Sequence, residues 1–101
     1  MTDELSTVVT IGHPAGLHLR PAALFVRTAS GFSSRVSVRN LSRDGSPTVD
    51  AKSMLGIMQA AVSQGHRVEI RASGADAGAA IAALERLVER GFTDEDAPAQ
   101  P

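Results

Sequence analysis

Two hydrophobic periods alternate along this chain of 101 residues, and their order restricts the folds open to it. Segments that alternate polar and apolar residues, or that are rich in β-branched residues, predict strands at 6–11, 34–41, 48–51 and 67–71. Apolar residues three to four positions apart predict three helices, at 19–30, 53–62 and after residue 76. The order β-α-β-β-α-β-α predicts a two-layer α+β domain of the split β-α-β kind. It would have a four-stranded antiparallel sheet with the helices on one face.

Turn and capping residues mark where the predicted elements begin and end. Asp44-Gly45 is typical of a hairpin turn between two strands. Ser53 and Asp76 are predicted to cap the second and third helices through their side-chain oxygens. Gly91 suits the left-handed position after the last helix, with Phe92 folding back onto that helix.

The length suits one domain with a single core, which we place at residues 1–92. Three Phe and no Trp or Tyr mean that this core is built mainly from aliphatic side chains. Residues 93–101 are acidic and contain proline, so they are predicted to form a disordered tail.

Composition excludes several classes of function. There is no cysteine, which excludes disulfides, thiolate metal sites and thiol catalysis. A formal net charge of −1 and the lack of Tyr and Trp argue against a nucleic-acid-binding protein. The sequence shows neither a signal peptide nor an apolar run long enough to span a membrane, so a cytoplasmic protein is expected.

One segment, from Gly16 to Ala23, combines the residues that a phosphate site needs. A helix start offers N–H donors without intrahelical partners and a partial positive charge, and Pro21 fits its first turn. The N–H group of Leu19 and the planar guanidinium of Arg20 can meet a phosphate group. His18 supplies a neutral imidazole that can act as a nucleophile. Gly16 lets the preceding loop approach closely, so the segment predicts a histidine that carries a phosphoryl group.

These residues are similar to a known family. Residues 16–22 (GLHLRPA) resemble the active-site signature of the HPr phosphocarrier proteins of the bacterial phosphoenolpyruvate:sugar phosphotransferase system. Residues 52–58 (KSMLGIM) resemble that family's regulatory-serine segment, and Gln64-Gly65 before a strand fits the same pattern. The resemblance covers about Thr7 to Phe92 and implies the HPr-like open-faced sandwich.

The resemblance implies a shuttle that is not an enzyme by itself. His18 would accept a phosphoryl group from phosphorylated Enzyme I and pass it to the IIA domain of a sugar permease. Ser53 would be the target of a regulatory serine kinase/phosphorylase found in some bacterial groups. No metal or organic cofactor is implied, and a monomer is expected. The residues that would dock the partners are Leu17, Leu19, Arg27, Met54, Leu55 and Met58.

Two alternatives stay open at this stage. The chain is either such a carrier or a non-catalytic binding module, in which Ser53 would matter more than His18. A relay that serves regulation rather than sugar uptake is the nearer alternative. A metal site at His13 and His18 lacks a third ligand. Leu19 is bulky where relatives usually have a small residue, and the hairpin at 40–47 is longer than usual.

Overall fold

The computed structural model describes residues 4–92, so the predicted tail at 93–101 lies outside the described residues. The elements follow the predicted order β-α-β-β-α-β-α. Their bounds are β1 (Glu4–Thr10), α1 (Leu19–Ser30), β2 (Arg35–Asn40), β3 (Thr48–Asp50), α2 (Met54–Ala60), β4 (Arg67–Ser73) and α3 (Ala77–Glu89).

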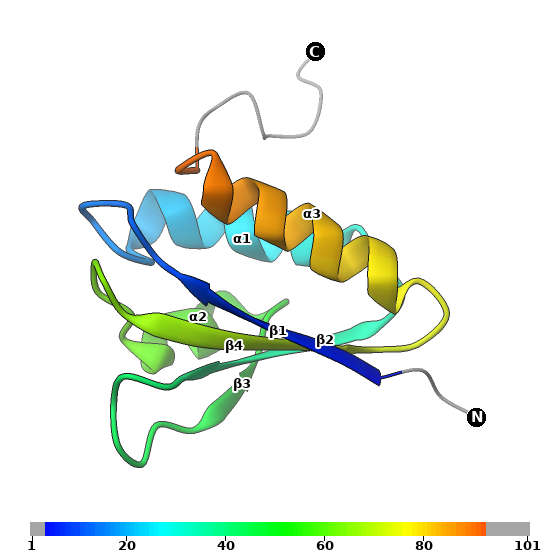
Figure 1. Cartoon of the computed structure of the whole chain (residues 1–101), viewed down its shortest axis with the longest axis horizontal. Coiled ribbons are helices and arrows are strands. Elements are labelled where there is room, and N and C mark those ends of the chain that lie inside the picture. The colour runs from blue at the N-terminus through cyan, green and yellow to red at the C-terminus, as the bar shows by residue number, and fades with distance from the viewer. Residues whose placement is uncertain (1–3, 93–101) are drawn as a thin grey trace.

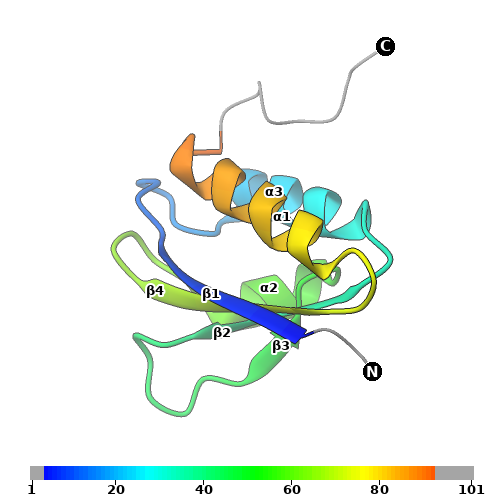
Figure 2. The same cartoon turned by 45° about the vertical axis from the view of Figure 1, so that its right-hand side comes forward.

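The four strands form one antiparallel sheet in the order β1-β4-β2-β3. All three helices lie on the same side of this sheet, as Figures 1 and 2 show, which confirms the predicted α+β architecture. β1 and β4 are both longer than predicted, because their antiparallel register pairs Glu4 with Ser73 and Thr10 with Arg67. The open face of the sheet carries exposed arginines, as an antiparallel sheet allows.

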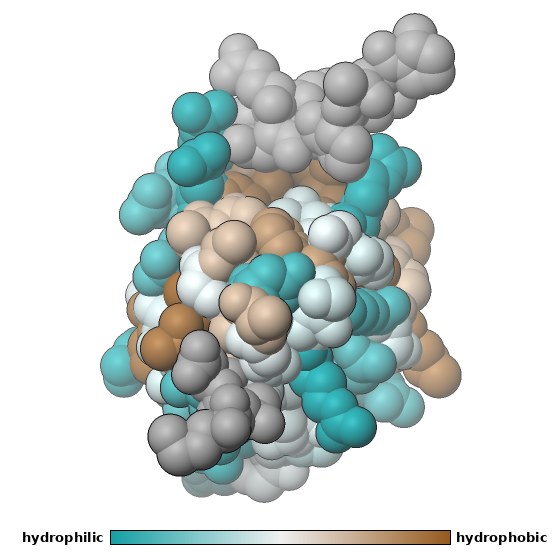
Figure 3. Space-filling view, turned by 90° about the vertical axis from the view of Figure 1, so that its right-hand side faces the viewer, coloured by the Kyte–Doolittle hydropathy of each residue, from teal (hydrophilic) through white to brown (hydrophobic). Residues whose placement is uncertain are grey.

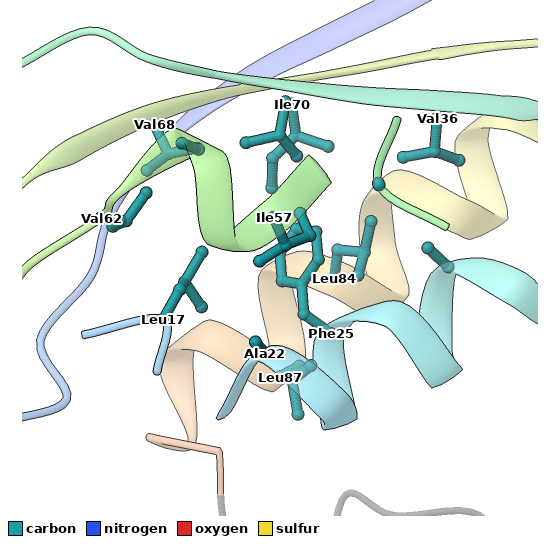
Figure 4. Close-up of a cluster of buried hydrophobic side chains, with 14 of the residues drawn as sticks. Leu17, Ala22, Phe25, Val36, Ile57, Val62, Val68, Ile70, Leu84 and Leu87 are labelled. Atoms are coloured by element: carbon teal, nitrogen blue, oxygen red, sulfur yellow. The ribbon is translucent and has the colours of Figure 1, made fainter. Parts of the chain in front are cut away.

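The core lies between the sheet and the helices. Figure 4 shows Ile57 of α2 between Ile70 of the sheet and Phe25 of α1. All three side chains are fully buried, as is Leu84 of α3. This mainly aliphatic core, with Phe25 and Phe92 as its buried aromatic residues, is the kind of core that the composition predicts.

Helix α2 ends at Ala60, two residues before the predicted end. Ala61 takes a left-handed conformation (φ 51°) and its N–H group donates to the carbonyl of Met58. The helix therefore ends before Gln64-Gly65. The left-handed position after α3 is confirmed at Gly91 (φ 71°), and the N–H group of Phe92 donates to the carbonyl of Leu87 at 3.1 Å.

The prediction that Asp76 caps α3 with its side chain is wrong. Asp76 occupies the N-cap position but makes no side-chain capping bond. Its carboxylate instead accepts hydrogen bonds from the N–H groups of Ser33 and Ser34, both at 2.9 Å, and from both serine hydroxyls. These bonds, with the Ser34 hydroxyl contributing most, lower the pKa of Asp76 to about 2.

Asp76 therefore ties the β4–α3 connection to the connection between α1 and β2. Figure 3 looks at this end of the molecule, where hydrophilic and hydrophobic side chains are mixed on the surface. The site around residues 16–23 lies at the other end, where β1 leads into α1 (Figure 1).

Candidate functional site

His18 is the N-cap residue of α1 and its side chain is exposed. Its backbone is extended (φ −83°, ψ −166°), and its carbonyl accepts the first helical hydrogen bond, from the N–H group of Ala22 at 2.7 Å. The imidazole makes no capping hydrogen bond. The ring therefore stands at the positive end of a helix without being used to hold that helix together.

The loop before His18 rests on the connection between α2 and β4. The N–H group of Leu17 donates to the carbonyl of Val62 at 3.0 Å, and the N–H group of Gly16 donates to the carbonyl of His13 at 2.8 Å. Gly16 has φ 59°, and a Cβ atom there would lie 2.3 Å from the Val62 oxygen. Only glycine allows so close an approach in this conformation.

The residues after His18 divide between the solvent and the core. Leu19 and Arg20 are exposed, with 67% of Leu19 accessible. Pro21 is buried in the first turn of α1, where its missing N–H group leaves no helical bond unmade. His18 and Arg20 thus both lie exposed at the start of α1, while Pro21 anchors the first turn in the core.

Ser53 is the N-cap of α2, as predicted. Its Oγ accepts a hydrogen bond from the N–H group of Gly56 at 3.0 Å, and its side chain is half-buried. Gly56 sits tightly against the preceding strand, because a Cβ atom there would lie 3.1 Å from the carbonyl oxygen of Asp50. Both residues fix the start of α2 against β3.

The predicted docking residues do not all face the solvent. Leu19 and Leu55 are exposed, at 67% and 69%, and Arg27 is exposed as well. Met54 and Met58 are half-buried against the core. Leu17 departs from the prediction, since its side chain is only 3% exposed and packs beside Val62 in the core (Figure 4). Its backbone N–H group bonds to the Val62 carbonyl, and its side chain is part of the core.

His13 and the acidic residues offer no metal site within the described part of the chain. His13 Nδ1 accepts a hydrogen bond from the N–H group of Ala15 at 3.0 Å, and its ring packs edge-to-face with the Phe92 ring, with centroids 6.1 Å apart. Across residues 4–92, no group of three His, Asp or Glu side chains could hold a metal ion. Within the same range, no helix is long and apolar enough to cross a membrane.

The sequence analysis gave no role to Asn40 and His66, two polar residues beside the connection between α2 and β4. Asn40 is 1% exposed and its Nδ2 lies 3.1 Å from both the Ala60 carbonyl oxygen and His66 Nδ1. A signal was present, because Val36, Val38 and Asn40 share the inward-facing alternation of β2. A polar residue on that face has to find partners inside the fold.

Comparison with known proteins assigns the family. A sequence model described as "PTS HPr component phosphorylation site" matches residues 5–90. The chain belongs to the HPr family. It is 41% identical to the phosphocarrier protein HPr of Treponema pallidum over 88 residues, which are 86% of this chain and 94% of that protein. A crystal structure of HPr from Thermoanaerobacter tengcongensis matches with a TM-score of 0.81 and 46% identity, covering 87% of this chain and 94% of that one.

Longer proteins also contain a segment similar to this chain. The multiphosphoryl transfer protein of Xanthomonas campestris is 37% identical over 91 residues, which are 90% of this chain but only 10% of that protein. Membership of the HPr family gives the chain a general phosphocarrier role.

Proposed function

We propose that His18 is the residue that carries the phosphoryl group, accepting it from phosphorylated Enzyme I and passing it to a IIA domain in the cytoplasm. The observation that supports this is the exposed imidazole at the N-cap of α1, which makes no capping bond. A neutral ring nitrogen of His18 attacks the phosphorus atom, and the bond between phosphorus and the donor group breaks, leaving that group on Enzyme I. The helix start and Arg20 meet the negative charge that arrives. The exposed position leaves the group accessible to the next acceptor.

The docking face of this carrier comprises the exposed and half-buried members of the predicted set. They lie on α1 and α2, two helices that pack against each other, with Leu19, Met54 and Leu55 in the first turns and Arg27 in the last turn of α1. Leu19 and Leu55 offer apolar contact, the two methionines adapt to different partners, and Arg27 adds a positive charge. One face of a monomer would serve Enzyme I and IIA in turn.

Labelling with phosphoenolpyruvate tests the assignment of His18. With Enzyme I present, the protein should gain an acid-labile, alkali-stable phosphate, and His18→Ala should gain none. His13→Ala is the matched control, because it removes a histidine from the same loop and should still be labelled. Normal labelling of His18→Ala would contradict the carrier role and favour a binding module without phosphohistidine chemistry.

We further propose that Ser53 is a regulatory phosphorylation site. Its Oγ already faces the N–H groups at the start of α2, so a phosphate there suits the helix dipole and leaves the fold intact. It adds a charge of about −1.5 to −2 beside the docking face, which repels an acidic partner.

A cognate serine kinase with ATP should give an acid-stable label that Ser53→Ala lacks. Ser53→Ala should also lower the free energy of unfolding by about 1 kcal/mol, because the cap is lost. Ser53→Asp keeps a capping oxygen and adds charge, so it should slow phosphoryl transfer from Enzyme I without that loss of stability. An unchanged transfer rate in Ser53→Asp would count against the regulatory role.

A further inference from the structure

Asn40 is a buried side chain whose hydrogen-bonding groups are all used. The N–H group of Ser42 donates to Asn40 Oδ1 at 2.9 Å, which fixes the orientation of the amide. Its Nδ2 lies 3.1 Å from both the Ala60 carbonyl oxygen and His66 Nδ1, and 3.5 Å from the Ala61 carbonyl oxygen. Asn40 therefore joins the end of α2 to the residue just before β4.

His66 closes the connection between these two elements, residues 61–66. Its N–H group donates to the carbonyl of Ser63, and the N–H group of Ser63 donates back to His66 Nδ1, both at 3.0 Å. Because the Ser63 N–H group is only a donor, Nδ1 is the acceptor and the ring hydrogen sits on Nε2. The turn is thus held by its backbone and by one ring nitrogen.

The His18 loop rests on this connection. Gly16 packs against Val62 and Ser63, where even a Cβ atom would not fit, and Leu17 bonds to the Val62 carbonyl at 3.0 Å. Gln64 Nε2 donates to the carbonyl of Gly12 at 3.1 Å, so the start of the loop is tied to the same connection. A shift of residues 61–66 would move the backbone on which His18 stands.

We propose that Asn40 and His66 are positioning residues for the His18 loop, acting through the 61–66 connection. The inference rests on the proposed role of His18 as phosphoryl carrier. Neither side chain touches the reacting atoms. They hold the backbone of Val62 and Ser63 in the position that places His18 at the start of α1.

The test compares variants that remove or keep a hydrogen-bond acceptor at the position of His66 Nδ1. His66→Phe puts a ring carbon where Nδ1 was, which leaves the Ser63 N–H group and one Asn40 hydrogen without their acceptor. His66→Asn restores an acceptor, because its Oδ1 stands the same number of bonds from the backbone as Nδ1. His66→Ala removes the acceptor without adding bulk and serves if the phenylalanine variant does not fold.

Val36→Ala is the matched control for general destabilisation. Val36 is buried in β2 near the end that Asp76 ties together, away from the 61–66 connection. The Val36→Ala substitution should lower the free energy of unfolding by removing core atoms, and it should leave the contacts of Gly16 and Leu17 unchanged.

Two measurements separate positioning from stability. The rate of phosphoryl transfer from Enzyme I to His18 should fall roughly tenfold to a hundredfold in His66→Phe, because a small misplacement of a reacting group has that effect. Amide hydrogen exchange at Leu17 should become about tenfold faster than in Val36→Ala, compared at equal global stability. His66→Asn should recover most of the transfer rate and most of the protection of the Leu17 amide from exchange.

The proposal is overturned if His66→Phe matches Val36→Ala in both measurements, or if His66→Asn recovers neither. Failure of the carrier role itself would look different. In that case the unaltered protein would take no label on His18, whereas the exchange of the Leu17 amide would still report on the connection.

Discussion

At the scale of single residues, the loop before His18 depends on the absence of a side chain at Gly16. Gly16 has a left-handed backbone and lies against the Val62 carbonyl, at a distance that no Cβ atom could keep. Gly45 has a similar backbone (φ 74°) in the β2–β3 hairpin, but nothing lies within 4 Å of its Cβ position. Substitutions at the two glycines therefore separate the energetic cost of a left-handed backbone from the cost of a steric clash.

Gly16→Ala should be more destabilising than Gly45→Ala. The second change adds only the strain of a left-handed alanine, about 1 kcal/mol. The first adds a clash with backbone at 2.3 Å, which the 61–66 connection can relieve only by moving. Urea unfolding of both variants measures the difference, and phosphoryl transfer should be slowed in Gly16→Ala alone. Equal unfolding midpoints would show that the backbone around Val62 moves away from a Cβ atom at position 16 at little cost in stability.

Among the elements, α3 is anchored at its start by a carboxylate rather than by a capping bond. Asp76 has an intermediate exposure, yet four hydrogen bonds from Ser33 and Ser34 favour its ionised form. Its pKa is about 2 in the folded protein, against 3.8 as the ordinary value. Folding therefore favours the charged form of this group.

The sign of the pH dependence follows from that lowered pKa. Above pH 3.8 the carboxylate is ionised in both states and its stabilisation is fully present. As the pH falls to about 2 the unfolded chain takes up a proton first, so this contribution to stability is lost. Asp76→Asn should be less stable than the unaltered protein at neutral pH, with a gap that narrows across this range.

Urea midpoints measured at a series of pH values provide the comparison. Glu89→Gln is the control, since Glu89 is an exposed carboxylate on the same helix. A gap between Asp76→Asn and the unaltered protein that stays constant with pH would contradict the role given to the four hydrogen bonds.

Sequence reasoning located the helix start at His18 and the cap at Ser53, because both depend on neighbours within a few residues. It misassigned Asp76, since a capping residue looks the same in sequence whether it bonds its own helix or a loop 42 or 43 positions away. Leu17 was placed outside for a related reason. A loop has no hydrophobic period, so nothing in the sequence indicates that the Leu17 side chain lies in the core.

Taken as a whole, the molecule has one core, in which the layer of three helices packs against one face of the sheet. Ile57 lies where α2, α1 and the sheet come together, fully buried, whereas Leu55 on the same helix is 69% exposed. The two side chains have the same number of carbon atoms. They therefore report separately on the stability of the fold and on its surface.

Ile57→Ala should lower the free energy of unfolding by about 2–5 kcal/mol, through lost burial and the cavity left behind. Leu55→Ala should change it by no more than about 0.5 kcal/mol, because the side chain is largely in solvent. Calorimetry or urea unfolding measures both. Leu55→Ala should instead weaken binding to Enzyme I, and a large loss of stability in that variant would place Leu55 in the core.

The exposed residues 18–20 are flanked on both sides by buried residues, Leu17 before them and Pro21 after them. We therefore expect this stretch of backbone to be held in place before any partner arrives. Little conformational entropy remains to be lost on docking, and encounter need not wait for a rearrangement. Association with each partner should then proceed as a rigid-body collision, at about 10⁵–10⁷ M⁻¹s⁻¹ or faster with electrostatic steering.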